Sequence, residues 1–380
     1  MSTTMTKRKS SQLRLGVLLL LLIATVAVGA FVPWIYQTAP NPVVVNALPH
    51  PLTATDAGVI LSRTDEPSLT LQQVQASSHQ DYGRFTVLAK YGVARSLITY
   101  RSYDTDGTPL TIYARVYQPI GVKNAPILGF APGTTGIGDV CAASLEIPQV
   151  ASWANYESHM LTYAGQGYAT VITDYEGMRD PGRLHHYMVG QLEGRAVLDS
   201  VRALINFDGK SDQLDTKHIF LAGYSQGGHA ALWADQLAAT YAPELKLSGV
   251  IGFGAVVSVE ETLADVTHGS NLDWFGPYVL VSYADYYHET YPLEQILQPK
   301  YRSNLSGDVT SHCINTDVEF WGTDPNAVFM PPFLEALQTH TLTASFPELA
   351  KRMQQNDAGA TTTPTPVSYT HLTLPTNREV

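Results

Sequence analysis

The stretch HIFLAGYSQGGHAALWADQL at residues 218–237 decides the fold, because an apolar strand pattern runs directly into a helical pattern through a glycine-rich turn. Its centre, residues 223–227, reads G-Y-S-Q-G. A serine at this spacing between a strand and a helix is typical of a nucleophile elbow, the sharp turn that exposes a reactive hydroxyl. Glycine has no Cβ to collide across such a turn. The sequence therefore predicts Ser225 as a catalytic nucleophile.

A nucleophilic serine also needs donors for the negative charge that develops on the substrate oxygen. The helix after Ser225 points its free N–H groups at the reacting atoms, so the amide of Gln226 is the first expected donor of an oxyanion hole. The second is expected in A-P-G-T-T-G, residues 131–136, which follows a short apolar run. We assign it to Thr134, although Gly133 or Thr135 would serve as well. The alternative is that this loop is only a turn.

Strand and helix patterns alternate around the elbow. They predict a hairpin of residues 94–103 and 109–118, strands at 125–130, 169–174, 218–224 and 247–253, and helices at 156–166, 191–206 and 226–241. Alternation of this kind indicates an α/β fold, a mostly parallel sheet with flanking helices and right-handed crossovers. Ser225 then lies at the carboxyl end of a strand, where such sheets place their sites.

The composition is that of an acidic globular chain. The 380 residues are 44% hydrophobic and 15% charged, with 23 basic and 34 acidic side chains and a formal net charge of −11. One large domain, or a domain with an insertion, fits this length. The absence of a basic stripe argues against nucleic acid as a partner. No motif implies a metal or an organic cofactor.

The first 36 residues have the pattern of a signal peptide or a signal anchor. Four basic residues, the last of them Arg14, precede an uncharged run over residues 15–36. Cleavage after Ala30 would suit a signal peptidase, whereas retention of the run would leave a membrane tether. Proline-rich residues 37–55 read as a linker. In either case the body of the protein is expected outside the cytoplasm.

Export bears on the state of the two cysteines, because disulfides form outside the cytoplasm. Cys141 and Cys313 are the only cysteines of the chain. In an oxidising compartment they are expected to form a disulfide. The alternative is a pair of free buried thiols; a catalytic cysteine is disfavoured because Ser225 holds the better position.

Further motifs occur in order along the chain. They are Y-R-S at residues 100–102 with Asp104 and Gly107, P-G-T-T-G at 132–136 followed by D-V-C-A-A-S at 139–144, D-Y-E-G at 174–177, L-D-S-V-R-A at 198–203 and G-Y-S-Q-G-G at 223–228. Through these motifs the chain resembles an α/β-hydrolase of the secretory lipase family.

That resemblance implies a domain plan: a hydrolase core over residues 56–257, an inserted, mainly helical cap over 258–351, and the start of a return to the core over 352–366. It also supports a disulfide between Cys141, close to the oxyanion loop, and Cys313 in the cap. In the family the cap covers an acyl-binding tunnel. Aromatic residues of this segment would either line such a pocket or form the core of the cap: Trp274, Phe275, Tyr278, Phe320, Trp321, Phe329 and Phe333.

A histidine base and its acid are harder to find, since this fold places them after the serine in the order serine, acid, histidine. His229 lies four residues past the serine on the same helix and is expected to be a packing residue. His185 and His186 precede the serine. Asp324 and His340 have the right order, but the resemblance puts both inside the cap.

The C-terminus offers a reason for this gap. Residues 367–376 read V-S-Y-T-H-L-T-L-P-T, which looks like the translation of a sequencing-library adapter. We therefore expect residues 367–380 to be an artefact, the native chain to be cut near Pro366, and the acid and histidine to lie beyond that point. His371 would then belong to the artefact. The alternative is a natural, disordered Thr/Pro-rich tail.

These patterns predict an exported serine ester hydrolase, a lipase or esterase whose parent protein acts on triacylglycerol or another carboxylic ester, while the chain as given has little or no activity. Ester or lipid small molecules are the expected partners. An exported peptidase or acyltransferase is the alternative within enzymes. A non-catalytic binding protein on a hydrolase scaffold is the alternative outside them.

Overall fold

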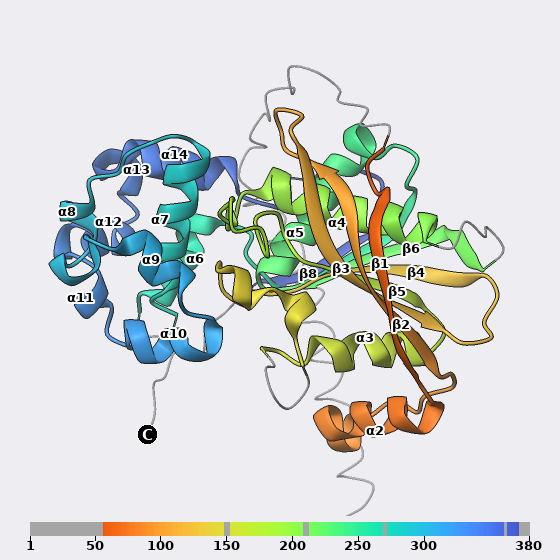
Figure 1. The fold of residues 1–380 in the computed structure, drawn as a ribbon. Coiled ribbons are helices and arrows are strands. Elements are labelled where there is room, and N and C mark those ends of the chain that lie inside the picture. Colours follow the sequence, from red (N-terminus) through yellow and green to blue (C-terminus); the bar gives the residue numbers. More distant parts are fainter. Residues whose placement is uncertain (1–55, 148–152, 208–212, 269–271, 361–362, 372–380) are drawn as a thin grey trace, which may run out of the picture. The chain divides into compact units, whose positions relative to one another are not determined.

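The structure, a computed structural model, describes residues 56–147, 153–207, 213–268, 272–360 and 363–371 (Figure 1). The predicted signal segment and linker therefore lie outside the described residues. None of the described helices has the length and apolar character needed to cross a membrane.

The described strands form one mixed sheet in the order β1-β2-β3-β5-β4-β6-β7-β8. Pairing is antiparallel from β1 through β3 to β5 and parallel from β5 to β8. The strands are β1 (Ile60–Leu69), β2 (Val93–Tyr103), β3 (Pro109–Pro119), β4 (Ala125–Ala131), β5 (Ala169–Thr173), β6 (Leu214–Tyr224), β7 (Leu247–Ala255) and β8 (Val367–His371). The order places the ends of β4 and β6, two neighbouring parallel strands, at the same edge of the sheet.

The larger helices of the core cover both faces of this sheet. They are α2 (Leu71–Tyr82), α3 (Tyr156–Gly165), α4 (Gly190–Asn206) and α5 (Gln226–Tyr241). Successive side chains of a strand point to opposite faces. In β4, Ile127 packs with the buried residues of α4 and α5, whereas Leu128 and Phe130 pack with those of α2 and α3. The two hydrophobic layers of an α/β protein follow from this alternation.

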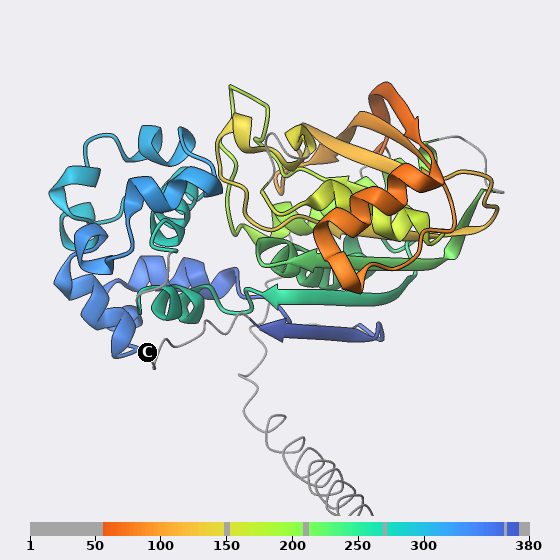
Figure 2. The same ribbon diagram turned by 90° about the horizontal axis from the view of Figure 1, so that it is seen from below.

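A helical segment is inserted between β7 and β8 (Figures 1 and 2). It contains α6 (Val259–Val266), α7 (Phe275–Tyr286), α8 (Leu293–Ile296), α9 (Leu305–Thr310), α10 (Ile314–Trp321), α11 (Pro325–Val328), α12 (Pro331–Gln338), α13 (Leu342–Ser345) and α14 (Pro347–Gln355). We call this segment the cap. Its side chains share one hydrophobic cluster with Ile137 and with buried residues of the segment 187–192. The cluster includes six of the seven aromatic residues singled out above, and Phe320 packs against it.

Four short 3-10 helices complete the described elements. They are η1 (Gly83–Phe85), η2 (Asp139–Cys141), η3 (Ala143–Leu145) and η4 (Pro299–Tyr301). β1 and α2 were not predicted from the sequence. β1 pairs only with β2 and is largely exposed, so it carries no apolar pattern; in α2 only Val74 and Ser78 are buried.

The last described strand falls on the residues expected to be an artefact. Val367–His371 pairs in parallel with β7, through Val250 and its neighbours (Figure 2). This pairing uses backbone groups, which nearly every residue supplies. The strand therefore does not bear on the origin of residues 367–380, and that prediction stays open.

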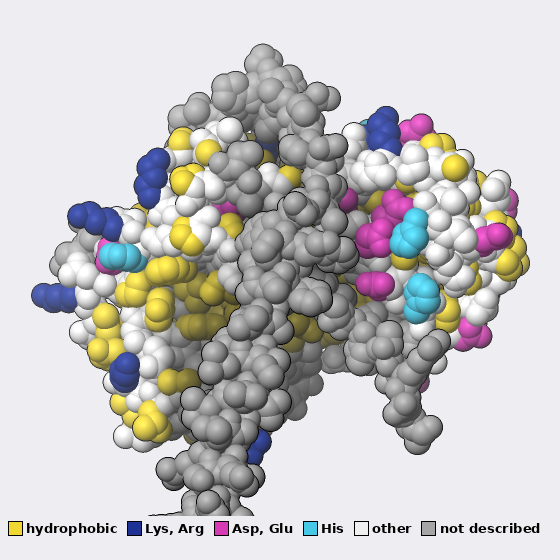
Figure 3. Space-filling model, turned by 180° about the vertical axis from the view of Figure 1, so that it is seen from behind, with side chains coloured by type: hydrophobic (Ala, Val, Ile, Leu, Met, Phe, Trp, Pro, Cys, Tyr) yellow, Lys and Arg dark blue, Asp and Glu magenta, His cyan; other side chains and the backbone are white. Residues whose placement is uncertain are grey.

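One face of the last strands remains uncovered. Tyr224, Ile251, Phe253 and Tyr369 are 42–48% exposed, and hydrophobic side chains gather on the face of the molecule seen in Figure 3. Parallel sheets are normally covered on both faces. The described part of the chain thus leaves apolar side chains of β6, β7 and β8 in contact with solvent.

Candidate active site

Ser225 occupies the expected turn between strand and helix. β6 ends at Tyr224 and α5 begins at Gln226, and Ser225 has φ 54° and ψ −116°. A non-glycine residue in such a conformation costs about 1–3 kcal/mol and persists only where its surroundings enforce it. One enforcing contact is the hydrogen bond of 2.8 Å from the Ser225 amide to the carbonyl of Phe253. The serine itself is half-buried.

The glycines of the motif are required by close backbone contacts. A Cβ on Gly223 would lie 1.9 Å from the carbonyl oxygen of Gly227. A Cβ on Gly227 would lie 1.9 Å from the carbonyl oxygen of Ala131 and 2.7 Å from that of Pro132. The elbow is thus in direct contact with the end of β4, where the second expected donor loop begins.

We call Ser225 and Gln226 the elbow arm of the site. Gln226 is the first residue of α5, so the helix itself offers its N–H no acceptor. The Gln226 side chain is fully buried; its Nε2 donates to Glu193 Oε1 over 2.7 Å and lies 2.9 Å from His185 Nε2. Its Oε1 has no partner among the described residues, so the side chain is held through its nitrogen alone.

We call residues 132–136 the loop arm. The hydroxyl of Tyr175 donates to the Pro132 carbonyl over 2.6 Å. The hydroxyl of Tyr156 lies beside Gly133, because a Cβ on Gly133 would lie 2.9 Å from it. Thr134 and Thr135 follow Gly133 in the loop and are candidates for a free donor. Within the described residues, no acceptor hydrogen-bonds to either of their amides.

The side chain of Thr134 has a partner of its own. Its Oγ1 lies 2.7 Å from the hydroxyl of Tyr187, and both side chains are buried. Tyr187 packs edge-on against Phe275 and Tyr278 of the cap helix α7. The loop arm therefore contacts the cap through this tyrosine.

The cap also fastens the loop arm through its backbone. Cys141 and Cys313 form a disulfide, so the alternative of two free thiols is not what the structure contains. Ile314 donates its amide to the Thr135 carbonyl over 3.0 Å, and Gly136 forms an isolated bridge with Cys313. A covalent bond and backbone hydrogen bonds thus hold the loop arm against the start of α10.

In the described part of the chain, no side chain hydrogen-bonds to the Ser225 hydroxyl. Asp324 accepts from the amide of Asn326 at the start of α11. His340 is exposed and pairs with Glu261 over 3.2 Å. The structure therefore does not bring Asp324 and His340 together, and it places both in the cap, away from the elbow.

His229 is fully buried beneath the elbow. Its Nδ1 lies 2.6 Å from Glu193 Oε2, and its Nε2 lies 2.7 Å from the carbonyl oxygen of Asn356, where the cap returns to the core. Both neighbours are acceptors. His229 therefore binds α4 and the end of the cap rather than the serine, a more specific role than the packing role expected from sequence.

A second histidine–carboxylate cluster joins the core to α7. His186 lies between Glu176, at 2.8 Å, and Asp285 of the cap, at 2.9 Å. Burial lowers the pKa of His186, but the two carboxylates raise it further, so the net shift is upward. Burial raises the pKa of Glu176, yet hydrogen bonds from His185 and His186 hold it at about 2. Sequence reasoning set these histidines aside because they precede the serine.

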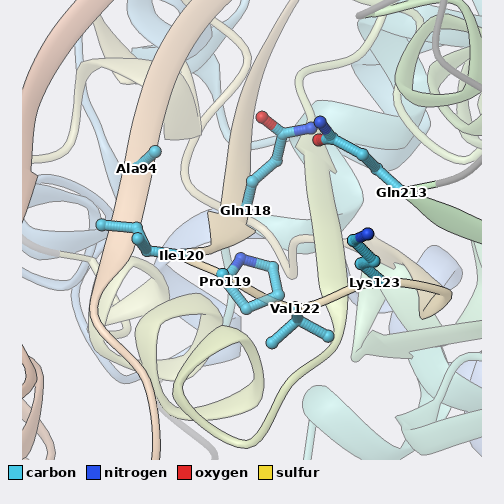
Figure 4. A pocket seen from close by; sticks show the side chains of 8 residues that line it. Ala94, Gln118, Pro119, Ile120, Val122, Lys123 and Gln213 are labelled. Atoms are coloured by element: carbon cyan, nitrogen blue, oxygen red, sulfur yellow. The ribbon is translucent and has the colours of Figure 1, made fainter.

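The surface pocket in Figure 4 lies at another place. It has a volume of about 300 Å³ and is lined by Ala94, Gln118, Pro119, Ile120, Gly121, Val122, Lys123 and Gln213. These residues surround the start of β4 and the end of β3, at the opposite edge of the sheet from Ser225. Among the residues that the structure describes, no group of three or more histidine, cysteine, aspartate or glutamate side chains could hold a metal ion.

Known proteins resemble this chain in sequence. The profile of the family described as "Secretory lipase" matches residues 151–327. Lipase 1 of Candida albicans is 28% identical over 59% of this chain and 48% of its own length. Secreted triacylglycerol lipase LIP4 of Malassezia globosa is 31% identical over 47% of this chain and 38% of its own length. The chain spans about half the length, or less, of the curated relatives it matches.

Solved structures resemble it in fold. The rice cell wall degrading esterase LipA of Xanthomonas oryzae matches with a TM-score of 0.66 at 22% identity, over 82% of both chains. Candida antarctica lipase A in its closed state matches with a TM-score of 0.58 at 20% identity, over 84% of this chain and 69% of that one. At these identities the likeness shows the α/β-hydrolase fold.

Proposed function

The chain is a secretory lipase-family α/β-hydrolase, and on this basis we propose that its parent protein hydrolyses carboxylic esters through Ser225. The observation that carries the proposal is the strained turn at Ser225, with φ 54°, beside a loop arm with unbonded amides. Such a turn presents the serine hydroxyl and the first N–H of the helix to one substrate carbonyl. Lipases and esterases among the relatives favour an ester over a peptide.

In the proposed reaction, the Ser225 oxygen attacks the acyl carbon while a histidine takes the hydroxyl proton. The amides of Gln226 and Thr134 donate to the oxygen that becomes negative. The histidine returns the proton to the departing alcohol, which leaves an acyl group on Ser225. Water, activated by the same histidine, then releases the acid and regenerates the serine.

We further propose that this histidine and its acid lie outside the described residues, beyond Pro366. The fold places the acid after a late strand and the histidine after the acid. Reading the uninterrupted gene past Pro366 should reveal an aspartate after an apolar strand and a histidine some tens of residues later. A continuation without them would overturn this part.

A lipid ester is the proposed substrate class, since relatives include a secreted triacylglycerol lipase. We also propose export, from the N-terminal pattern and the secreted relatives. The test uses protein from the uninterrupted gene with p-nitrophenyl esters of graded acyl length, triacylglycerol and a peptide panel. Ser225→Ala should abolish ester hydrolysis. Peptide cleavage alone would favour the peptidase, and no turnover at all would favour a binding protein.

A further inference from the structure

The buried ring of His185 contacts both arms of the site, the loop arm through Tyr175 and the elbow arm through Gln226. It stacks on Tyr175, with centroids 5.3 Å apart and planes 9° apart, and Tyr175 holds the Pro132 carbonyl of the loop arm. The same ring lies 2.9 Å from Gln226 Nε2 of the elbow arm. The His185 side chain is fully buried, so water does not reach either contact.

The hydrogen-bond partners fix the roles of these groups. Glu193 Oε1 is an acceptor, so the side-chain nitrogen of Gln226 faces it and donates one of its two protons to it. The second proton points to His185 Nε2, which therefore accepts. His185 Nδ1 lies 3.1 Å from the Glu176 carbonyl and carries the ring proton. Both protons of Gln226 Nε2 and the lone pair of His185 Nε2 are thus paired, whereas Gln226 Oε1 has no partner among the described residues.

The hydrogen bonds of the Gln226 side chain also restrain the backbone N–H of Gln226, which is the oxyanion donor in the proposed reaction. The peptide group between Ser225 and Gln226 carries the Gln226 N–H, and ψ of Ser225 sets its direction. Ser225 has a strained conformation with φ 54° and ψ −116°, which persists only where the surrounding contacts hold it. The two hydrogen bonds that Gln226 Nε2 donates to Glu193 and His185 add to that restraint.

We propose that His185 and Glu193 are positioning residues of the oxyanion hole. They hold the side-chain nitrogen of Gln226 and thereby the direction of its backbone N–H, and the contact of His185 with Tyr175 aligns this N–H with the loop arm. The inference rests on the proposed function for its catalytic meaning. Glu193 also accepts from the Met188 amide over 3.1 Å, so its carboxylate joins the elbow to the segment that leads into α4.

Four variants separate positioning from bulk stability. Glu193→Leu removes the acceptor, whereas Glu193→Gln retains an acceptor oxygen and should rescue. Gln226→Met removes the side-chain amide at similar volume. His185→Phe keeps the stacking on Tyr175 but loses the acceptor. Asp199→Asn is the matched control: it alters a buried carboxylate of the same helix, bonded to Ser102, Arg202 and Tyr241, that does not contact the elbow.

Two measurements on the full chain are needed. The first is the rate at which an aryl phosphonate labels Ser225, with imidazole as an external base and Ser225→Ala as the blank. Loss of one oxyanion donor costs about 10²–10³ in rate, so loss of its support should slow labelling about tenfold or more. Glu193→Leu, Gln226→Met and His185→Phe should show this loss. Glu193→Gln and Asp199→Asn should stay within about threefold of the unaltered chain, since neither removes a bond to the Gln226 nitrogen.

The second measurement is amide hydrogen exchange of residues 224–230 and 132–137. Exchange over 224–230 should rise about tenfold in Glu193→Leu and Gln226→Met, where one or two bonds are lost, and not in Asp199→Asn. Labelling of protein from the uninterrupted gene no faster than its Ser225→Ala blank would overturn the proposed function, and hydrogen exchange would still decide the positioning role. Unchanged exchange in Glu193→Leu, or an equal rise in Asp199→Asn, would overturn the inference.

Discussion

The two arms of the candidate site are built in different ways. The elbow arm, Ser225 and Gln226, follows from the backbone of one strand–turn–helix unit, with glycines at the two positions where a Cβ would lie 1.9 Å from a backbone oxygen. The loop arm, residues 132–136, is held from outside by tyrosines, a disulfide and the backbone of the cap. A short motif therefore specifies the backbone turn of the first arm, whose Gln226 side chain is then held by His185 and Glu193. The second arm depends in addition on cap residues more than a hundred positions away.

The largest effect is expected where the two arms touch. Gly227→Ala would drive a Cβ to 1.9 Å from the Ala131 carbonyl oxygen, with no flexible side chain to move aside. We expect a loss of about 4 kcal/mol in the free energy of unfolding, or no folding at all, measured by urea titration. Gly182→Ala is the control, because its Cβ would meet nothing closer than 3.5 Å. Similar losses in both variants would contradict the role assigned to Gly227.

Removal of the disulfide should loosen the loop arm and spare the elbow arm. The bond closes a separation of 172 residues, and such a link contributes about 2–5 kcal/mol. Cys141→Ser with Cys313→Ser should lower the unfolding free energy by that amount and speed amide exchange over residues 132–137. Exchange over residues 224–230 should change far less. An equal rise in both segments would show that the arms are not independently supported.

The segment after the loop arm should respond to pH through Asp174. This carboxylate accepts from the amide of Ser144, which follows the disulfide in η3, and burial raises its pKa from 3.8 to about 6. Since the folded form binds the proton more tightly, its stabilising contribution is full below pH 3.8 and is lost as the pH rises through about 6.

The unaltered chain should therefore lose about 1–3 kcal/mol relative to Asp174→Asn between these two pH values. Urea titrations of both proteins across this range measure the difference. The half-buried Asp215 gives a control of opposite sign, because its hydrogen bond with His218 lowers its pKa. A difference that does not vary with pH would contradict the role of Asp174.

The smallest effect is expected for the side chain of Thr134. Thr134→Val and Tyr187→Phe each remove the hydrogen bond of 2.7 Å between their hydroxyls but leave the backbone of the loop arm unchanged. A double-mutant cycle of unfolding free energies should give a coupling of about 0.5–1.5 kcal/mol. Thr134→Val should label at Ser225 nearly as fast as the unaltered chain. A large loss of labelling would mean that the hydroxyl, not the amide, faces the substrate.

The expectations from sequence succeeded where a pattern was local. The strand ending at Tyr224 and the helix from Gln226 to Tyr241 were predicted from periodicity and turn chemistry alone. β1 was missed because an exposed edge strand has no apolar alternation to detect. His185 and Glu193 were not recognised because their signal is a contact with Gln226, 41 and 33 residues away. No spacing rule in the sequence encodes such a contact.

The sequence by itself determined the nucleophile candidate, the α/β class and the expectation that the cysteines pair, because each depends on residues whose geometry is set within a few positions or on the composition of the whole chain. Only the tertiary structure decided that the Tyr156 hydroxyl lies beside Gly133, that the cap fastens the loop arm at Thr135, and that His185 lies between the supports of both arms. The physical reason is that hydrogen bonds and ring contacts are short-range, so their partners are chosen by the packing of distant segments.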